Sequence, residues 1–148
     1  MQRRVVPDIV SSQKLTTFSP DTTVRDAVAL MNERSIGAIL VMNDDQLAGI
    51  FTERDLLRRV VAASRDPDTT RLDEVMTTDP DTLTPKATAM EALLLMRSRG
   101  YRHLPVLEND KLIGIVSIRD LFAAVQEELE QDVRQRDALL FDTGYGTG

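Results

Sequence analysis

The chain lacks cysteine and tryptophan, has a single histidine, and contains no long basic run. Without cysteine it can form no disulfide, thiolate nucleophile or zinc–sulfur site. His103 has no second histidine or cysteine to share a metal ion, so no metal site is expected. A net charge of −6 without a concentrated positive face argues against nucleic acid as a partner.

Long apolar stretches are also missing. No apolar run approaches the length that spans a membrane, and the charged N-terminus is not followed by an apolar segment. We therefore expect a cytoplasmic protein without a membrane contact. The sequence shows no nucleophile–base pair and no glycine-rich phosphate loop, so we expect no enzymatic activity and no catalytic cofactor.

The chain does contain an internal repeat. Residues 17–57 align without a gap on residues 82–122, and fifteen of the forty-one aligned positions are identical. A repeat of this length indicates two copies of one structural unit, and each copy alone is near the size at which a hydrophobic core becomes marginal. We therefore predict an α+β fold in which two pseudo-twofold-related β-α-β-β-α repeats form one compact module. Any binding site should occur as a related pair.

The apolar spacing and turn residues define the elements of each copy. In the first copy we expect strands at 15–18, 36–42 and 47–51, helices at 24–34 and 52–61, and a helix cap within 19–22. In the second we expect strands at 82–83, 103–107 and 112–116, a helix at 90–99, and a last helix opened by Ser117.

Smaller features complete the prediction. Short helical segments are expected at 72–76 and 5–10, each preceding one copy. The acidic turns 43–45 and 109–110 suit tight hairpins rather than cation binding. Met31, Met90 and Met96 are expected to fill the core.

The candidate binding residues of each copy lie where its last expected strand meets the next helix. They form the elements Thr52-Glu53-Arg54-Asp55 and Ser117-Ile118-Arg119-Asp120. A hydroxyl at a helix start with a carboxylate three residues later is a capping box, which needs no ligand. The same geometry also suits a nucleotide. The helix N-terminus attracts phosphate, and a carboxylate one turn further accepts from ribose hydroxyls. Gly49 and Gly114 would let the backbone approach closely.

These elements sit within blocks that occur twice and in order. The repeat resembles the CBS (cystathionine-β-synthase) domain, and the pair resembles a Bateman module of the stand-alone bacterial type. The matching blocks are Ser19–Thr23 with Thr84–Thr88, Ile36–Val41 with Tyr101–Val106, and Leu47–Asp55 with Leu112–Asp120.

The resemblance implies a regulatory module that binds AMP, ADP, ATP or NAD in clefts between the two repeats. Asp55 and Asp120 would hold the ribose, and Thr52 and Ser117 the phosphate or ribose. The backbone of 36–39 and 101–104 would read the adenine. The expected nucleotide-binding residues are Thr17, Ile36, Gly37, Ala38, Ile39, Thr52, Arg54, Asp55, Thr82, Tyr101, Arg102, His103, Leu104, Pro105, Ser117, Arg119 and Asp120.

Some alternatives stay open. His103 either lines the pocket or is structural, and Arg54 and Arg119 either contact phosphate or form surface ion pairs. Arg102 and His103 replace Gly37 and Ala38, so the second copy should favour a phosphorylated ligand more strongly.

The domain boundaries follow from the repeat. We expect CBS repeat 1 at 8–62, a connector at 63–71, CBS repeat 2 at 72–125, and a charged helix with a disordered tail at 126–148. The resemblance implies a homodimer through the amphipathic helices and a regulated partner on a separate chain. The stripe Leu129, Val133 and Leu139–Leu140 packs either on a partner or on its own module. The alternative function is a structural interaction module without a nucleotide.

Overall fold

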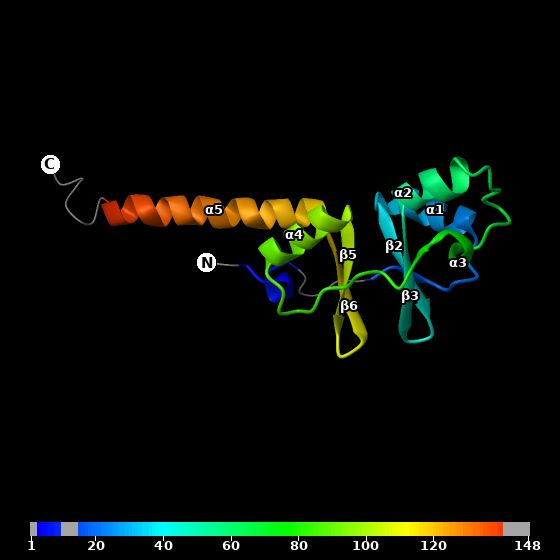
Figure 1. The fold of residues 1–148 in the computed structure, drawn as a ribbon, viewed down its shortest axis with the longest axis horizontal. Coiled ribbons are helices and arrows are strands. Elements are labelled where there is room, and N and C mark those ends of the chain that lie inside the picture. Colours follow the sequence, from blue (N-terminus) through cyan, green and yellow to red (C-terminus); the bar gives the residue numbers. More distant parts are fainter. Residues whose placement is uncertain (1–2, 10–14, 141–148) are drawn as a thin grey trace. The chain divides into compact units, whose positions relative to one another are not determined.

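The computed structural model describes residues 3–9 and 15–140, which divide into two compact units (Figure 1). The described residues of 13–82 and 105–114 form the repeat-1 unit, and those of 1–12, 83–104 and 115–148 form the repeat-2 unit. Both contain helices and strands, so the predicted α+β fold with two repeats is confirmed. Among the described residues, no helix is both long and apolar enough to cross a membrane.

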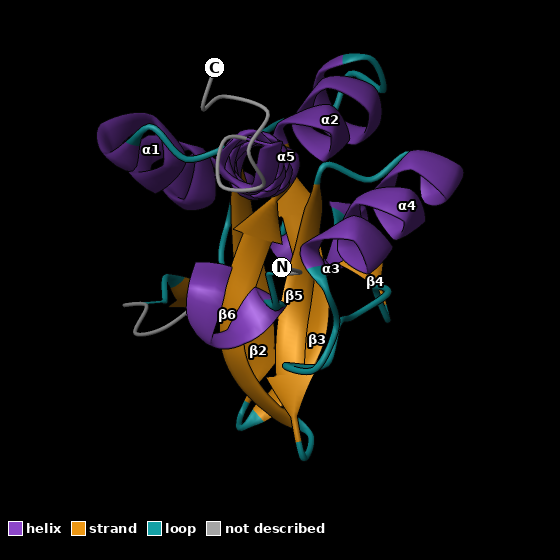
Figure 2. Cartoon of the chain, turned by 90° about the vertical axis from the view of Figure 1, so that its left-hand side faces the viewer, coloured by secondary structure: helices purple, strands orange, loops and turns teal. Residues whose placement is uncertain are grey.

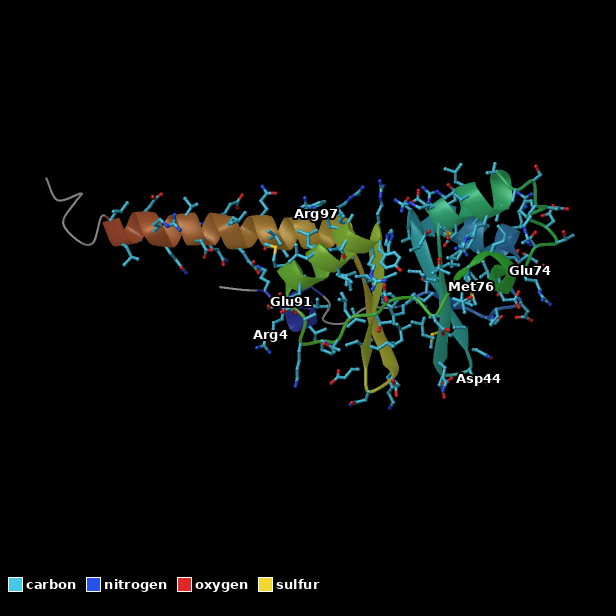
Figure 3. The ribbon with its side chains drawn as sticks, viewed as in Figure 1. Arg4, Asp44, Glu74, Met76, Glu91 and Arg97 are labelled. Atoms are coloured by element: carbon cyan, nitrogen blue, oxygen red, sulfur yellow. The ribbon has the colours of Figure 1, made fainter. Side chains whose placement is uncertain are left out.

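The first repeat forms a four-stranded sheet with helices beside it. Its elements are β1 (Thr17–Phe18), α1 (Val24–Arg34), β2 (Ala38–Asn43), β3 (Gln46–Thr52), α2 (Glu53–Asp55) continuing as η2 (Leu56–Val61), α3 (Leu72–Val75) and β4 (Thr77–Thr78). The strand order is β1-β2-β3-β4, with β1 parallel to β2 and the other pairs antiparallel. Figure 2 shows β4 beside β3. The hairpin turn lies at Asp44, as expected from its residues (Figure 3).

The core of this unit forms because apolar residues recur at helical spacing in α1 and densely in β2. Val24, Ala27 and Met31 of α1 are buried against β2 and β3. Leu72 and Val75 of α3 complete the same cluster, so the short helix expected at 72–76 contributes directly to the first repeat's core.

The cap of α1 differs from the expectation. The cap was placed within 19–22, but Thr23 caps the helix, and its hydroxyl accepts from the amide of Asp26 at 3.2 Å. Ser19 instead donates to Asp21 at 2.5 Å within the preceding turn. At the other end, Ser35 has the left-handed backbone that usually requires glycine.

The second repeat forms a hairpin and two packed helices. Its elements are η1 (Val5–Ile9), α4 (Ala89–Arg99), β5 (His103–Glu108), β6 (Lys111–Ser117) and α5 (Ile118–Leu140). β5 pairs with β6, and α4 packs against α5 (Figure 1). Thr88 caps α4 in a capping box with Glu91, and Gly100 ends the helix.

Two expectations for this repeat are wrong. The strand expected at 82–83 does not form, and Leu83 makes only an isolated bridge. Pro85 and the turn that it begins follow directly, and they prevent a longer run of strand hydrogen bonds. Met90 is 40% exposed instead of filling the core, since it lies on the outer face of α4, whereas Met96 is buried. The charged residues from 126 to 140 form the distal part of α5, and the tail expected to be disordered at 144–148 lies outside the described residues.

The segment before each repeat folds onto the other repeat. We call residues 70–73 and 3–6 the lead-in segments, since each precedes one copy of the repeat. Residues 70–73 precede repeat 2 but bond to repeat 1, where the amide of Val24 donates to Thr70 and the amide of Leu72 donates to Thr22. Residues 3–6 precede repeat 1 but close repeat 2, where Val5 donates to Ala87 and Ala89 donates to Arg3. Each unit therefore contains a lead-in segment from the other copy.

Candidate functional site

The first hydroxyl–carboxylate element forms a complete capping box at the start of α2. The amide of Asp55 donates to the Thr52 hydroxyl at 3.3 Å, and the amide of Thr52 donates to Oδ2 of Asp55 at 3.0 Å. The Thr52 hydroxyl also donates to the same oxygen at 3.2 Å. Asp55 is buried, with 8% of the residue's surface exposed.

The second element repeats this geometry at the start of α5. The amide of Asp120 donates to the Ser117 hydroxyl at 3.1 Å, and the amide of Ser117 donates to Oδ2 of Asp120 at 3.2 Å. Asp120 is exposed. Both elements are therefore capping boxes, as the three-residue spacing predicts.

The residues that enter the second strand of each copy lie beside these boxes. The amide of Glu53 donates to the carbonyl of Gly37 at 3.0 Å, and the amide of Ile118 donates to the carbonyl of Arg102 at 2.8 Å. Ala38 pairs with Thr52 across β2 and β3. Each predicted adenine-reading segment thus lies against the predicted phosphate and ribose residues of its own copy.

The other predicted residues are placed as follows. Thr17 pairs with Leu40 in β1, and its side chain is exposed. The side chains of Ile39, Leu104 and Pro105 are buried, so a ligand could reach only their main-chain atoms. Thr82, Arg54, Arg102 and Arg119 are exposed, while Tyr101 and His103 are partly buried.

Two side chains that sequence reasoning missed contact Asp55. Thr77 Oγ1 lies 3.5 Å from Oδ1 of Asp55, and Nε of Arg59 lies 3.7 Å from the same oxygen. Arg59 follows Asp55 by four residues, so helical spacing could have identified it. Thr77 is twenty-two residues away, and only the tertiary fold brings it close.

Gly49 lies where the backbone of β4 approaches β3 closely. A Cβ atom at this position would lie 2.6 Å from the carbonyl oxygen of Thr77 and 2.7 Å from the sulfur of Met76. Figure 3 shows Met76 at the segment that passes β3. The glycine therefore allows β4 to pair with β3, whatever else approaches it.

A pocket of about 370 Å³ opens beside α1 and α2 in the repeat-1 unit. Its lining residues are Val28, Met31, Asn32, Ser35, Ile36, Glu53 and Leu56. Ile36 is a predicted site residue, and Glu53 lies between the two capping-box residues Thr52 and Asp55, so the pocket borders the start of α2. Among the described residues, no group of three or more acidic, histidine or cysteine side chains could hold a metal ion.

Two aspartates with a lowered pKa, Asp21 and Asp68, belong to neither hydroxyl–carboxylate element. A hydrogen bond from Arg25 at 2.7 Å lowers the pKa of Asp68 in the connector. The hydroxyl of Ser19 likewise lowers the pKa of Asp21. These two contacts join side chains at the protein surface.

Comparison with known proteins identifies the family. A family model described as "CBS domain" matches residues 6–62 and again residues 72–127. The chain belongs to the CBS domain family. It carries a tandem pair of CBS domains, as predicted from the repeat.

Relatives of this chain include CBS proteins from plants and bacteria. It is 35% identical over 125 residues to the mitochondrial CBS domain-containing protein CBSX3 of Arabidopsis thaliana, which covers 81% of this chain and 61% of that protein. The chain thus spans about three fifths of the plant relative. CBS-domain pair proteins are commonly regulatory modules, and stand-alone members are generally regulatory rather than catalytic.

Solved structures share the fold. A putative signal-transduction protein with CBS domains from Burkholderia ambifaria is 43% identical, with a TM-score of 0.75 over 78% of this chain and 85% of that one. A hexameric CBS-CP12 protein from bloom-forming cyanobacteria is 26% identical, with a TM-score of 0.73 over 99% of this chain and 91% of that one.

Proposed function

We propose that this CBS pair is a non-enzymatic regulatory module whose ligand is an adenosine-containing nucleotide: AMP, ADP, ATP or NAD. Binding would alter the association of the chain with itself or with a separate regulated protein. A ligand shifts such an equilibrium only by its different affinity for the two arrangements.

The observation that carries this proposal is the repeated element at the starts of α2 and α5. In both copies a hydroxyl, a carboxylate and the carbonyl of the residue just before a neighbouring strand meet at a helix N-terminus. The helix end favours a phosphate, the hydroxyl can donate to it, and the carboxylate can accept from ribose hydroxyls. Phosphate and ribose hydroxyls are groups that all four candidate ligands carry.

The proposed assembly is a homodimer through the amphipathic helices. Leu57 and Val61 on η2 and Leu94 on α4 are each more than half exposed, which suits surfaces that a second copy covers. The hexameric cyanobacterial relative supports self-association of such chains.

The test is a thermal-unfolding screen of the purified protein with AMP, ADP, ATP and NAD. A ligand present at a hundred times its dissociation constant adds about 2.7 kcal/mol. For a chain of this size, that corresponds to a midpoint rise of about 5–10 °C. Asp120→Ala should abolish the rise, while Asp137→Ala on the distal part of α5 should preserve it. Lack of a rise with all four nucleotides at millimolar concentration would refute the proposal.

The second candidate function is a structural interaction module without a nucleotide. The observation in its favour is that both carboxylates already serve in capping boxes. In that case Asp120→Ala would cost only the cap, about 0.5–2 kcal/mol, and no nucleotide would change the midpoint.

A further inference from the structure

We infer that the distal part of α5, residues 126–140, docks antiparallel on α4 of a second copy of this chain. The inference rests on the homodimer proposed above, for which it names two surfaces that contact each other. It does not depend on nucleotide binding. Residues 128–140 lie beyond the end of the family match, so this surface is not part of the domain that the family shares.

The apolar face of distal α5 lies away from the side of the helix that its own unit buries. Leu129, Val133 and Leu140 are each more than half exposed. At 3.6 residues per turn they fall within an arc of about 40°. Leu121 and Ala124 are buried in the repeat-2 unit, and they lie roughly 130° around the helix from that arc. The unit therefore covers one side of α5, and the apolar face occupies another.

A similar face is exposed on α4. Leu94 is 54% exposed, and Met90, one turn earlier, is 40% exposed. Arg97 follows Leu94 by one turn and is also exposed. Figure 3 shows Glu91 and Arg97 near the two ends of α4. The apolar centre of this face thus has an acid on its N-terminal side and a base on its C-terminal side.

Distal α5 has the same order of charge around its apolar face. In each helix an acidic, an apolar and a basic residue follow one another at spacings of three: Glu91, Leu94 and Arg97 in α4, and Glu130, Val133 and Arg136 in α5.

This shared order selects the direction of the pairing. When Leu94 faces Val133 in a parallel pair, acid lies level with acid and base with base. In an antiparallel pair Arg97 lies level with Glu130 instead. At the other end of the contact, Glu91 lies level with Arg136. Because opposite charges attract and like charges repel, the antiparallel direction is the favourable one.

The partner helix belongs to a second copy. α5 is one continuous helix of 23 residues, about 34 Å long, and α4 packs against it in the same unit. Figure 1 shows the distal part of α5 extending beyond α4. Since the helix continues without a break, its distal part cannot turn back onto α4 of its own chain. Each chain offers both surfaces, so a twofold-symmetric pair forms the contact twice.

The first experiment measures the dimer dissociation constant of the full chain by sedimentation equilibrium without nucleotide. Val133→Asp should raise this constant by about a hundredfold or more, because it places a charge in the apolar centre of both contacts. Gln135→Asp is the matched control, since it adds the same charge about 160° around α5 from Val133. The control should leave the constant within about twofold, and both variants should keep the helix signal in circular dichroism.

The second experiment reverses one charge on each surface. Arg97→Glu and Glu130→Arg should each raise the dissociation constant by about tenfold, since two like-charge pairs replace two opposite ones. An equimolar mixture of the two variants should associate as tightly as the wild type. In a mixed dimer, α5 of each chain again meets a residue of opposite charge on α4 of the other, which no arrangement within one chain would restore.

The outcomes separate this contact from the proposed homodimer and from the proposed ligand. Equal dissociation constants for Val133→Asp and Gln135→Asp would overturn the contact and leave the homodimer to other surfaces. An unchanged constant for Arg97→Glu, or a mixture no tighter than either variant alone, would overturn the role of α4. A monomeric wild type would overturn the contact and the homodimer together, while the thermal screen would still decide nucleotide binding.

Discussion

Gly49→Ala tests how tightly β4 is fitted to β3. The new methyl carbon would lie 2.6 Å from the carbonyl oxygen of Thr77, closer than a Cβ atom normally approaches any heavy atom. The sulfur of Met76, at 2.7 Å, can move aside with its flexible side chain, but the Thr77 oxygen belongs to the backbone. Relief therefore requires β4 to shift away from β3, although Gly49–Thr78 and Ile50–Thr77 are the pairs that hold it.

Two effects of opposite sign determine the magnitude. Overfilling a packed site costs about 1–3 kcal/mol. Replacing glycine in a strand returns about 0.5–1 kcal/mol, because alanine has less backbone freedom to lose on folding. The net expectation is a loss of about 1–2 kcal/mol, or a fall of about 2–8 °C in the midpoint for a chain of this size.

Thermal unfolding and amide hydrogen exchange together provide the assay. Gly49→Ala should lower the midpoint and increase exchange at the β3–β4 pairs. Gly100→Ala is the control, since its Cβ would meet no atom within 4 Å and only the left-handed φ of 76° penalises it. That control should lose stability without faster exchange in β4. An unchanged midpoint and unchanged exchange in Gly49→Ala would refute the steric reasoning.

Three further outcomes are expected. Ser35→Gly should stabilise the chain by about 0.5–1 kcal/mol in thermal unfolding, because Ser35 has the left-handed φ of 53° that glycine adopts freely; a lower midpoint would contradict this. Arg25 lowers the pKa of Asp68, so this carboxylate stabilises the fold above its unfolded pKa of about 3.9 and the gain is lost as pH falls through the lower folded value. Asp68→Asn should therefore flatten the acid limb of a stability–pH curve, and an identical acid limb would speak against the ion pair. For the proposed homodimer, Leu94→Asp on an exposed face of α4 should reduce the sedimentation coefficient to that of a monomer without loss of helix signal, and unchanged sedimentation would exclude this surface from the proposed interface.

Local pattern was sufficient to predict most of the secondary structure. The helical spacing of Val24, Ala27 and Met31 predicts both α1 and the face it buries, and the acidic turns predict the tips of the hairpins. The same reasoning placed the strand at 82–83 incorrectly, because two residues beside a proline carry too little pattern to distinguish a strand from a bend. Copying a weak element from one repeat to the other added no independent information.

Long-range contacts account for what the sequence did not predict at the candidate site. The hydroxyl–carboxylate pairs are three residues apart, so local spacing identified both capping boxes. Thr77 lies near Asp55 because the segment before the second copy packs against the first copy. The spacing of residues in the sequence does not indicate this packing. The sequence likewise predicts close backbone approach at Gly49, but only the fold shows that the approaching backbone is that of Thr77 in β4.

The crossing of the lead-in segments explains why equal motifs need not have equal roles. Each repeat is completed by residues that precede the other copy, so the surroundings of the two carboxylates come from different parts of the sequence. The identity between copies preserves Asp55 and Asp120, but it does not extend to the arginine that follows Asp55 by one helical turn. Duplication thus supplies two copies of the hydroxyl–carboxylate chemistry. Because Arg59 supports the end of α3 while Ala124 stands at the aligned position of the second copy, the two carboxylates have different neighbours one helical turn further on.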